Sequence, residues 1–200
     1  PLFKRVADLW ARKDDLGLSA EQERVLFLTH RGFVRAGAAL EGEADKRMAE
    51  IKGRLATLGT EFTQNLLADE REWFMEVGED DLEGLPAFVI DAMRAAGKEK
   101  GVDGPVVTTS RSIITPFLQF SPRRALREKA YKAFISRGAN GGDHDNRGIA
   151  AEVLKLREER AKLLGYDNFA AYKLETEMAK TPDKVEELLL AVWQPAKARA

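Results

Sequence analysis

Apolar residues recur every three or four positions along most of the chain, which is the period of an amphipathic helix. The clearest stripe lies between residues 45 and 66, where charged residues fill the intervening positions. Its members are Met48, Ile51, Leu55, Leu58, Phe62 and Leu66. This spacing predicts one long helix with a single buried face.

Capping residues mark the predicted ends of other helices. Ser19 stands three residues before Gln22, which is the arrangement of a capping box and predicts a helix over about residues 20–37. A helix is also predicted over about residues 86–97, with proline in its first turn and glycine at its end. A Ser-Pro pair at 121–122 is predicted to begin the next helix.

Two stretches depart from the helical period. Residues 73–78 form a short aromatic and β-branched run, and residues 105–120 are rich in Val, Thr, Ile and Phe. They predict two or three short antiparallel strands, with Pro116 at an edge or a bulge because proline cannot donate to a sheet ladder. We therefore expect a mainly α fold, a single helical domain over residues 1–200 with a small β-containing insertion at about residues 71–120.

The last third of the chain is divided by helix signals. Either residue of the Asp-Asn pair at 145–146 is predicted to cap one helix, and Gly165 is predicted to end it in the left-handed conformation. A second Asp-Asn pair at 167–168 begins another helix, and Thr181 begins a third. Apolar spacing then continues to Ala200 without a cap, which favours an element cut inside a longer chain.

Composition narrows the class of protein. The chain has 32 basic and 33 acidic residues and a formal net charge of -1, so no overall field favours nucleic acid or an anionic membrane. It has no cysteine, which excludes disulfides and thiolate chemistry. No apolar run approaches the ~20 residues of a membrane-spanning helix. We expect a cytoplasmic protein.

Candidate metal ligands are few. His30 lies in a predicted helix with Val34 at the fourth position after it, where a zinc-binding helix needs a second ligand. His144 lies between Asp143 and Asp145, whose carboxylates could hold a hard cation. As a calcium loop the sequence fails at two ligand positions, and helix capping explains these carboxylates at less cost. Capping is the favoured interpretation, and we assign no metal ligand.

Cations are concentrated between residues 123 and 137. We call this set the basic stripe: Arg123, Arg124, Arg127, Lys129, Lys132 and Arg137. A nucleic-acid surface has this appearance, but the apolar residues between the cations already form a core face, which favours a solvated helix surface. An acidic cluster precedes it, made of Glu79, Asp80, Asp81 and Glu83. No phosphate loop, nucleophile elbow or His-Glu-x-x-His motif occurs, so no catalytic or substrate-binding residue is assigned.

The run "LREERAKLLGYDNFAAYKLETEMAKTP" (156–182) resembles the thimet oligopeptidase family of zinc metallopeptidases. The matching positions are Arg157, Ala161, Leu163, Leu164, Gly165, Tyr166, Ala170, Met178, Ala179 and Lys180. Other pieces agree in the same order, namely "FVRAGAAL" (33–40), "RLATLGTEFTQNLL" (54–67), "REKAYKAFISRG" (127–138) and "DNRGI" (145–149). They look most like the bacterial peptidyl-dipeptidase branch.

The resemblance implies a fold and a role. Family members are two-lobed, mostly helical zincin-like peptidases whose channel admits short peptides, and His-Glu-x-x-His with a further glutamate supplies the zinc site. Because this sequence lacks that motif, the resemblance implies a piece of the non-catalytic lobe that walls the channel and is inactive on its own. No cofactor is expected in this chain, and zinc is expected in the full-length parent.

The expected partners follow from the same resemblance. They are short peptides and the missing catalytic half, and neither nucleic acid nor a membrane is expected. Apolar faces that met the catalytic half would be exposed along Val185, Leu188, Leu189, Val192 and Trp193 and would promote self-association. The alternative is a stand-alone helical protein-interaction module without catalysis.

Overall fold

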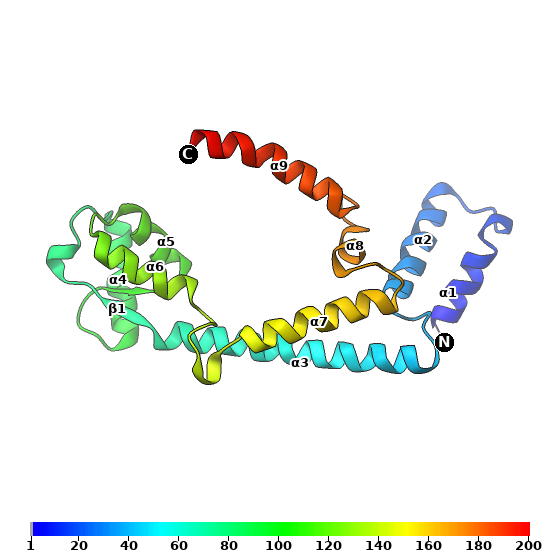
Figure 1. Ribbon diagram of the computed structural model, residues 1–200, viewed down its shortest axis with the longest axis horizontal. Coiled ribbons are helices and arrows are strands. Elements are labelled where there is room, and N and C mark those ends of the chain that lie inside the picture. The colour runs from blue at the N-terminus through cyan, green and yellow to red at the C-terminus, as the bar shows by residue number, and fades with distance from the viewer. Residues whose placement is uncertain (1) are drawn as a thin grey trace. The chain divides into compact units, whose positions relative to one another are not determined.

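The computed structural model describes residues 2–200, which form a mainly helical fold with one small sheet (Figure 1). The helices are α1 (Leu2–Ala11), α2 (Ala20–Arg35), α3 (Gly42–Glu72), α4 (Ala87–Lys100), α5 (Arg111–Phe120), α6 (Arg124–Ile135), α7 (Arg147–Leu163), α8 (Phe169–Leu174) and α9 (Pro182–Arg199). The strands β1 (Phe74–Glu76) and β2 (Val106–Thr108) pair antiparallel, with Met75 opposite Val107. The predicted mainly α class with a small antiparallel sheet is confirmed.

Most predicted helix starts and ends are confirmed. Ser19 and Gln22 form the capping box at the start of α2, with each side chain accepting a bond from the other residue's backbone. Asn168 caps α8 and Thr181 caps α9 through side-chain oxygens. Gly165 ends α7 at φ 83°, in the left-handed region that favours glycine.

The prediction of strands up to residue 120 is wrong, because Arg111–Phe120 forms helix α5 with Pro116 inside it. Ile113, Ile114 and Phe117 are all buried, and their spacing of one and three residues lies on one side of a helix. Burial of this face outweighs the local preference of β-branched residues for strands and the hydrogen bond that proline removes.

Helix α4 continues beyond its predicted end at Gly97. The helix ends at Lys100, and Gly101 at φ 71° provides the left-handed terminus. Gly97 is buried inside the helix because the backbone of a following loop lies against it. A Cβ atom at this position would lie 1.9 Å from the carbonyl oxygen of Gly104. This glycine therefore permits close packing instead of ending the helix.

The Ser-Pro pair at 121–122 does not begin helix α6, which starts at Arg124. The backbone N–H of Ser121 donates to the carbonyl of Phe117 at 3.0 Å, so Ser121 closes α5 instead. Its hydroxyl accepts from the backbone N–H of Arg123 at 3.3 Å. The serine therefore shapes the turn between the two helices, and the predicted boundary is wrong by two residues.

The described residues divide into two compact units. Unit 2 consists of residues 57–152, and unit 1 consists of the residues before and after it. Unit 2 contains the sheet, α4, α5 and α6 (Figure 1). These elements enclose an apolar core. The fully buried side chains of this core include Val89, Met93, Val106, Ile114 and Phe117. The prediction of a single domain stays a prediction.

Unit 1 has fewer buried apolar residues and more aromatic and ionic contacts. Its buried hydrophobic residues are Val6, Met48, Ile51, Leu156, Ala161 and Tyr172. Helix α1 packs on α2 through stacked rings, with Trp10 lying 5.1 Å from His30 between ring centroids. Arg47 of α3 holds Glu159 of α7 through two bonds of 2.6 and 3.0 Å.

Among the described residues, no helix combines the length and the apolar character needed to cross a lipid bilayer.

Candidate functional site

The run at 156–182 forms a polar cluster with the end of α2. Four of the cluster's residues come from this run, and the fifth comes from the resembling piece at 33–40. We call it the Arg35 cluster, and its members are Arg35, Arg160, Tyr166, Tyr172 and Glu175. Two of the segments that carry the family resemblance, 33–40 and 156–182, are therefore in contact in the folded chain.

Arg35 is the central residue of the cluster. One end of its guanidinium group donates to the Tyr166 hydroxyl at 3.2 Å and pairs with the Glu175 carboxylate. The other end donates to the Tyr172 carbonyl at 2.7 Å. The guanidinium carbon also lies 4.3 Å from the centre of the Tyr172 ring, a cation–π arrangement. With 14% of its side chain exposed, Arg35 is largely desolvated.

Local sequence features bring the tyrosines and the glutamate to Arg35. Gly165 ends α7 and allows the Tyr166 N–H to fold back onto the Ala161 carbonyl at 3.0 Å. Asn168 then caps the short helix α8, which carries Tyr172 and ends beside Glu175. The helix stop and start that the sequence predicts are thus the features that position the cluster.

The cluster controls the protonation of two of its groups. The hydrogen bond from Tyr166, at 2.6 Å, is the main cause that lowers the pKa of the Glu175 carboxyl, and the charge of Arg35 adds to it. Burial raises the pKa of Tyr166, and the neighbouring Glu175 raises it further. The tyrosine therefore stays a donor, the glutamate stays ionised, and Arg35 balances its charge.

This arrangement has the chemistry of a structural clamp. The Tyr166 hydroxyl donates to Glu175, and the Tyr172 hydroxyl accepts from Arg160 at 2.9 Å, so these polar groups are engaged with one another. The Nε of Arg160 is buried without a hydrogen-bond partner. No spacing in the sequence reveals the cluster, because Arg35 and Glu175 lie 140 positions apart.

The two histidines have different neighbours, since His30 lies among aromatic rings and His144 lies near a carboxylate. His30 stacks against Trp10 and lies beside Phe3 in the α1–α2 pair. His144 has its Nε2 atom 3.7 Å from Glu72 Oε1. Among residues 2–200, no group of three or more His, Cys, Asp or Glu side chains is arranged to hold a metal ion.

Asp145 serves as a helix cap. Its Oδ1 accepts from the Arg147 backbone N–H at 2.9 Å at the start of α7. The Arg147 side chain also donates to this carboxylate, and these bonds lower the Asp145 pKa to about 2. Asn146 is buried and bonds the Phe62 carbonyl at 3.0 Å. The Asp145 carboxylate therefore accepts a bond from the first N–H of α7, as the capping interpretation of residues 145–146 predicts.

The basic stripe and the acidic cluster meet in unit 2. Arg123 lies 3.0 Å from the Asp81 carboxylate and donates to the Asp80 carbonyl at 2.8 Å. Lys132 pairs with Glu128, and Arg137 pairs with Glu70 at 2.6 Å. Pairing reduces the charge that the stripe presents to a polyanion, which favours the interpretation as a solvated helix surface.

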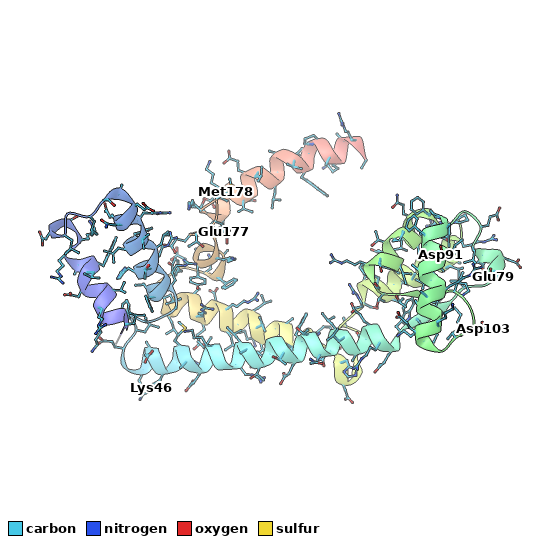
Figure 2. The ribbon with its side chains drawn as sticks, turned by 180° about the vertical axis from the view of Figure 1, so that it is seen from behind. Lys46, Glu79, Asp91, Asp103, Glu177 and Met178 are labelled. Carbon is cyan, nitrogen blue, oxygen red and sulfur yellow. The ribbon has the colours of Figure 1, made fainter. Side chains whose placement is uncertain are left out.

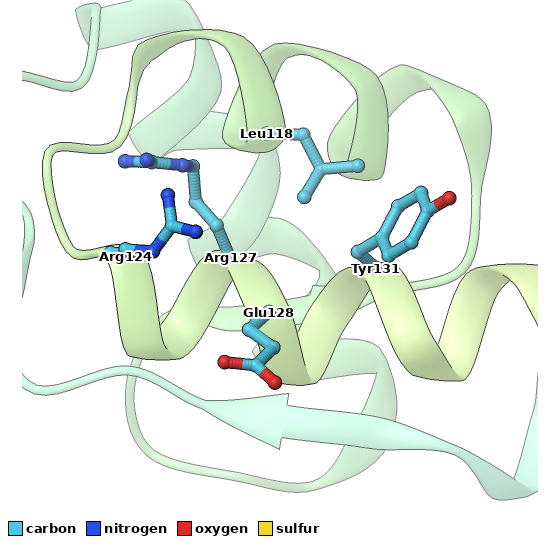
Figure 3. A pocket seen from close by; sticks show the side chains of 5 residues that line it. All are labelled: Leu118, Arg124, Arg127, Glu128 and Tyr131. Atoms are coloured by element: carbon cyan, nitrogen blue, oxygen red, sulfur yellow. The ribbon is translucent and has the colours of Figure 1, made fainter.

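A shallow cavity of about 310 Å³ lies on the same surface (Figure 3). Arg124, Arg127, Glu128 and Tyr131 of α6 line it together with Leu118 of α5. Arg127 donates to the Ser121 carbonyl at 2.5 Å, which ties it to the α5–α6 turn. Another face of α6 packs on the core of unit 2 through the fully buried Ala130.

Helix α9 exposes an apolar face, as expected. Between 51% and 64% of each of five large side chains is exposed, namely Leu188, Leu189, Leu190, Val192 and Trp193. Val185 is half-buried. Met178, between α8 and α9, is 99% exposed (Figure 2). We call the five residues the α9 face, which is the largest run of exposed apolar side chains on any one described helix.

Comparisons with known proteins bear on the whole chain. Residues 117–200 match the model of Peptidase family M3. The chain is 33% identical over 99% of its length to a dipeptidyl carboxypeptidase of Salmonella typhimurium, and 33% identical over its full length to the dipeptidyl carboxypeptidase of Escherichia coli. It is 32% identical over 98% of its length to oligopeptidase A of Escherichia coli.

The chain spans 29% to 30% of the length of these three relatives. The part of the chain that matches the family model, residues 117–200, includes α6 to α9 and four of the five residues of the Arg35 cluster. The relatives' similarity extends over the remainder of the chain, including α2 and α3. These matches place the chain in peptidase family M3.

Proposed function

We propose that this chain contributes to a zinc metallopeptidase that hydrolyses short peptides, as a peptidyl-dipeptidase or an oligopeptidase. In this proposal the chain forms a wall of the substrate channel. The observation that carries it is the 33% identity over the full chain to the Escherichia coli dipeptidyl carboxypeptidase. Short peptides are the proposed ligands of the complete enzyme.

Zinc does not fit the residues described here. His30 is stacked between aromatic rings, and His144 has one carboxylate within reach, whereas a catalytic zinc site needs three protein ligands. We therefore derive no chemical step through zinc in this chain. In the proposal, the metal and the hydrolytic residues belong to the catalytic half of the enzyme, which is the main partner of this chain.

The α9 face is the proposed contact with that half. An exposed apolar surface of this kind marks an interaction site. In the isolated chain, the same surface would promote self-association. We further propose a cytoplasmic location, which is supported by 33% identity to a probable cytosolic oligopeptidase A of Arabidopsis thaliana. Neither nucleic acid nor a membrane is a proposed partner.

A peptidase assay tests the proposal. We expect no turnover of a short fluorogenic peptide by the chain of residues 1–200 with added zinc, and zinc-dependent turnover by the complete gene product. Zinc-dependent turnover by a clean preparation of the chain alone would overturn the proposed division of labour. A complete gene product that hydrolyses no short peptide would overturn the peptidase role.

The alternative is a stand-alone helical interaction module, and the α9 face supports this possibility too. The two proposals differ in what the coding sequence encodes after Ala200. A downstream His-Glu-x-x-His motif favours the peptidase, whereas a stop codon favours the module.

A further inference from the structure

A second pocket of unit 2 combines a buried hydroxyl with several cations. It has a volume of about 290 Å³ and lies among the end of α3, the residue that follows β2, and the last turns of α6. We call it the Thr109 pocket, and the lining residues that matter are Asp69, Trp73, Thr109, Lys129, Lys132 and Arg137.

The hydroxyl of Thr109 is buried in the wall of the pocket and is not hydrogen-bonded. Thr109 is 1% exposed, and its Oγ1 has no hydrogen-bond partner. The adjacent Thr108 hydroxyl, in contrast, accepts from the Ser110 backbone N–H. A buried polar group without a partner is costly, so a ligand that accepts a hydrogen bond from Thr109 is favoured in this pocket.

The charges around this hydroxyl favour an anion. Three cations and one carboxylate line the pocket. The carboxylate, Asp69, already accepts from the Gly138 backbone N–H at 2.6 Å and from the Asn140 amide at 3.1 Å. Its negative charge is thus partly compensated by fixed donors.

The three cations differ in how firmly they are held. Arg137 is anchored by Glu70 and by the Phe134 carbonyl. Lys132 pairs with Glu128 on the surface, a contact that an incoming anion can replace at little cost. Among the residues that the structure describes, Lys129 forms no ion pair or hydrogen bond, so its ammonium group is available to a ligand.

We infer that the Thr109 pocket binds a compact oxyanion, the phosphate or carboxylate group of a small ligand. Such a group accepts hydrogen bonds from the Thr109 hydroxyl and from the lysine ammonium groups at once. The Trp73 ring on the pocket wall supplies an apolar surface for the remainder of the ligand. This binding is independent of the proposed peptidase role.

Trp73 also provides the readout. The chain has three tryptophans, and the changes Trp10→Phe and Trp193→Phe leave Trp73 as the only tryptophan, which is excited selectively above the tyrosine absorption band. Inorganic phosphate and N-acetyl-dialanine are titrated separately at constant pH and ionic strength. A saturable change in Trp73 fluorescence with either probe is expected, and the probe that binds identifies the source of the oxyanion.

Matched variants separate specific binding from general attraction. Thr109→Val removes the hydroxyl with little change of shape, and Lys129→Met removes the available charge, so each is expected to weaken binding about tenfold. Thr109→Ser keeps the hydroxyl, and Lys98→Met removes an exposed lysine of α4 outside the pocket. Both controls are expected to stay within about twofold of the parent chain.

Three outcomes would overturn the inference. The first is a linear, non-saturable response to both probes. The second is a Lys98→Met variant that loses as much affinity as Lys129→Met. The third is unchanged affinity in a Thr109→Val variant whose circular dichroism spectrum matches that of the parent.

Discussion

The two units of this chain are held together in different ways. Unit 2 encloses a continuous apolar core between its sheet and α4, α5 and α6, with Val89, Ile114 and Phe117 fully buried. Unit 1 buries fewer apolar side chains and joins its helices through the Arg35 cluster and the Arg47–Glu159 pair. The core of unit 2 depends on apolar burial, whereas unit 1 adds charge and hydrogen bonds to stacked rings and a smaller set of buried apolar residues.

The difference has consequences for stability. Apolar burial responds to lost volume and hardly to pH, whereas a charged cluster responds to protonation and to the loss of a single partner. A change in one unit should therefore reduce the protection of that unit's amides from hydrogen exchange more than the other's.

The largest effect is expected from Phe117→Ala in unit 2. Phe117 is fully buried in the core, so its truncation should lower the free energy of unfolding by about 3–5 kcal/mol. Hydrogen exchange should show the loss in α4, α5 and α6. Phe88→Ala in α4, where 62% of the side chain is exposed, is the control and should change stability by less than about 0.5 kcal/mol. An equal loss of protection in both units of the Phe117→Ala variant would contradict the expectation that a change in one unit acts mainly on that unit.

Arg35→Met in unit 1 should have the next largest effect. It removes the ion pair with Glu175 and two further hydrogen bonds, and it should cost about 2–3 kcal/mol. Protection should fall at the end of α2 and in α8. The control is Arg5→Met, because Arg5 is an exposed residue of α1. This change should leave the protection of α2 and α8 as it is in the parent chain. If α2 and α8 have the same protection from hydrogen exchange in Arg35→Met and in Arg5→Met, the cluster does not stabilise unit 1.

The Glu175 carboxyl should contribute to the pH dependence of unit 1. Its pKa is lowered in the folded state, so the stabilisation is present above its ordinary value of 4.5 and is lost as pH falls through the folded pKa. The protection of α8 amides, taken relative to the intrinsic exchange rate at each pH, should therefore fall at acid pH in the parent chain.

The variant Glu175→Gln isolates this contribution. It should show a smaller acid-induced change in α8 than the parent, while Glu41→Gln, an exposed acid outside the cluster, should behave as the parent does. The effect should be smaller than that of Arg35→Met, since Glu175 is partly exposed to solvent. An identical acid response in Glu175→Gln and the parent would exclude this carboxyl as the cause.

The smallest effect on stability is expected on the α9 face. Leu188→Glu combined with Val192→Glu should abolish concentration-dependent association, as measured by light scattering. The free energy of unfolding should change by less than about 0.5 kcal/mol. Leu154→Glu, an equally exposed apolar position on α7, is the control and should still associate. A parent chain that stays monomeric at high concentration would contradict the prediction.

Several features of the fold were predictable because they depend on neighbouring residues. The capping box of Ser19 and Gln22, the stop at Gly165 and the start at Thr181 each involve groups within a few positions of one another. The buried stripe of α3 follows from the helical period, and Met48, Ile51 and Leu58 are indeed buried.

Other features depend on contacts between distant residues. Pro116 and its β-branched neighbours favour a strand locally, but burial of Phe117 in the core makes the segment helical. Gly97 has the local character of a helix stop, but the Gly104 carbonyl lies against it and the helix continues. The site residues were harder to predict, since Thr109 stands out only by its burial and its missing hydrogen-bond partner.

The mainly helical class, most helix boundaries and the resemblance to a peptidase family were predictable because each of these is encoded in short runs of residues. How Arg35 meets Glu175 and where the Thr109 pocket lies follow from the folded chain alone. The physical reason is that burial, pairing and desolvation depend on which distant segments the folded chain brings into contact.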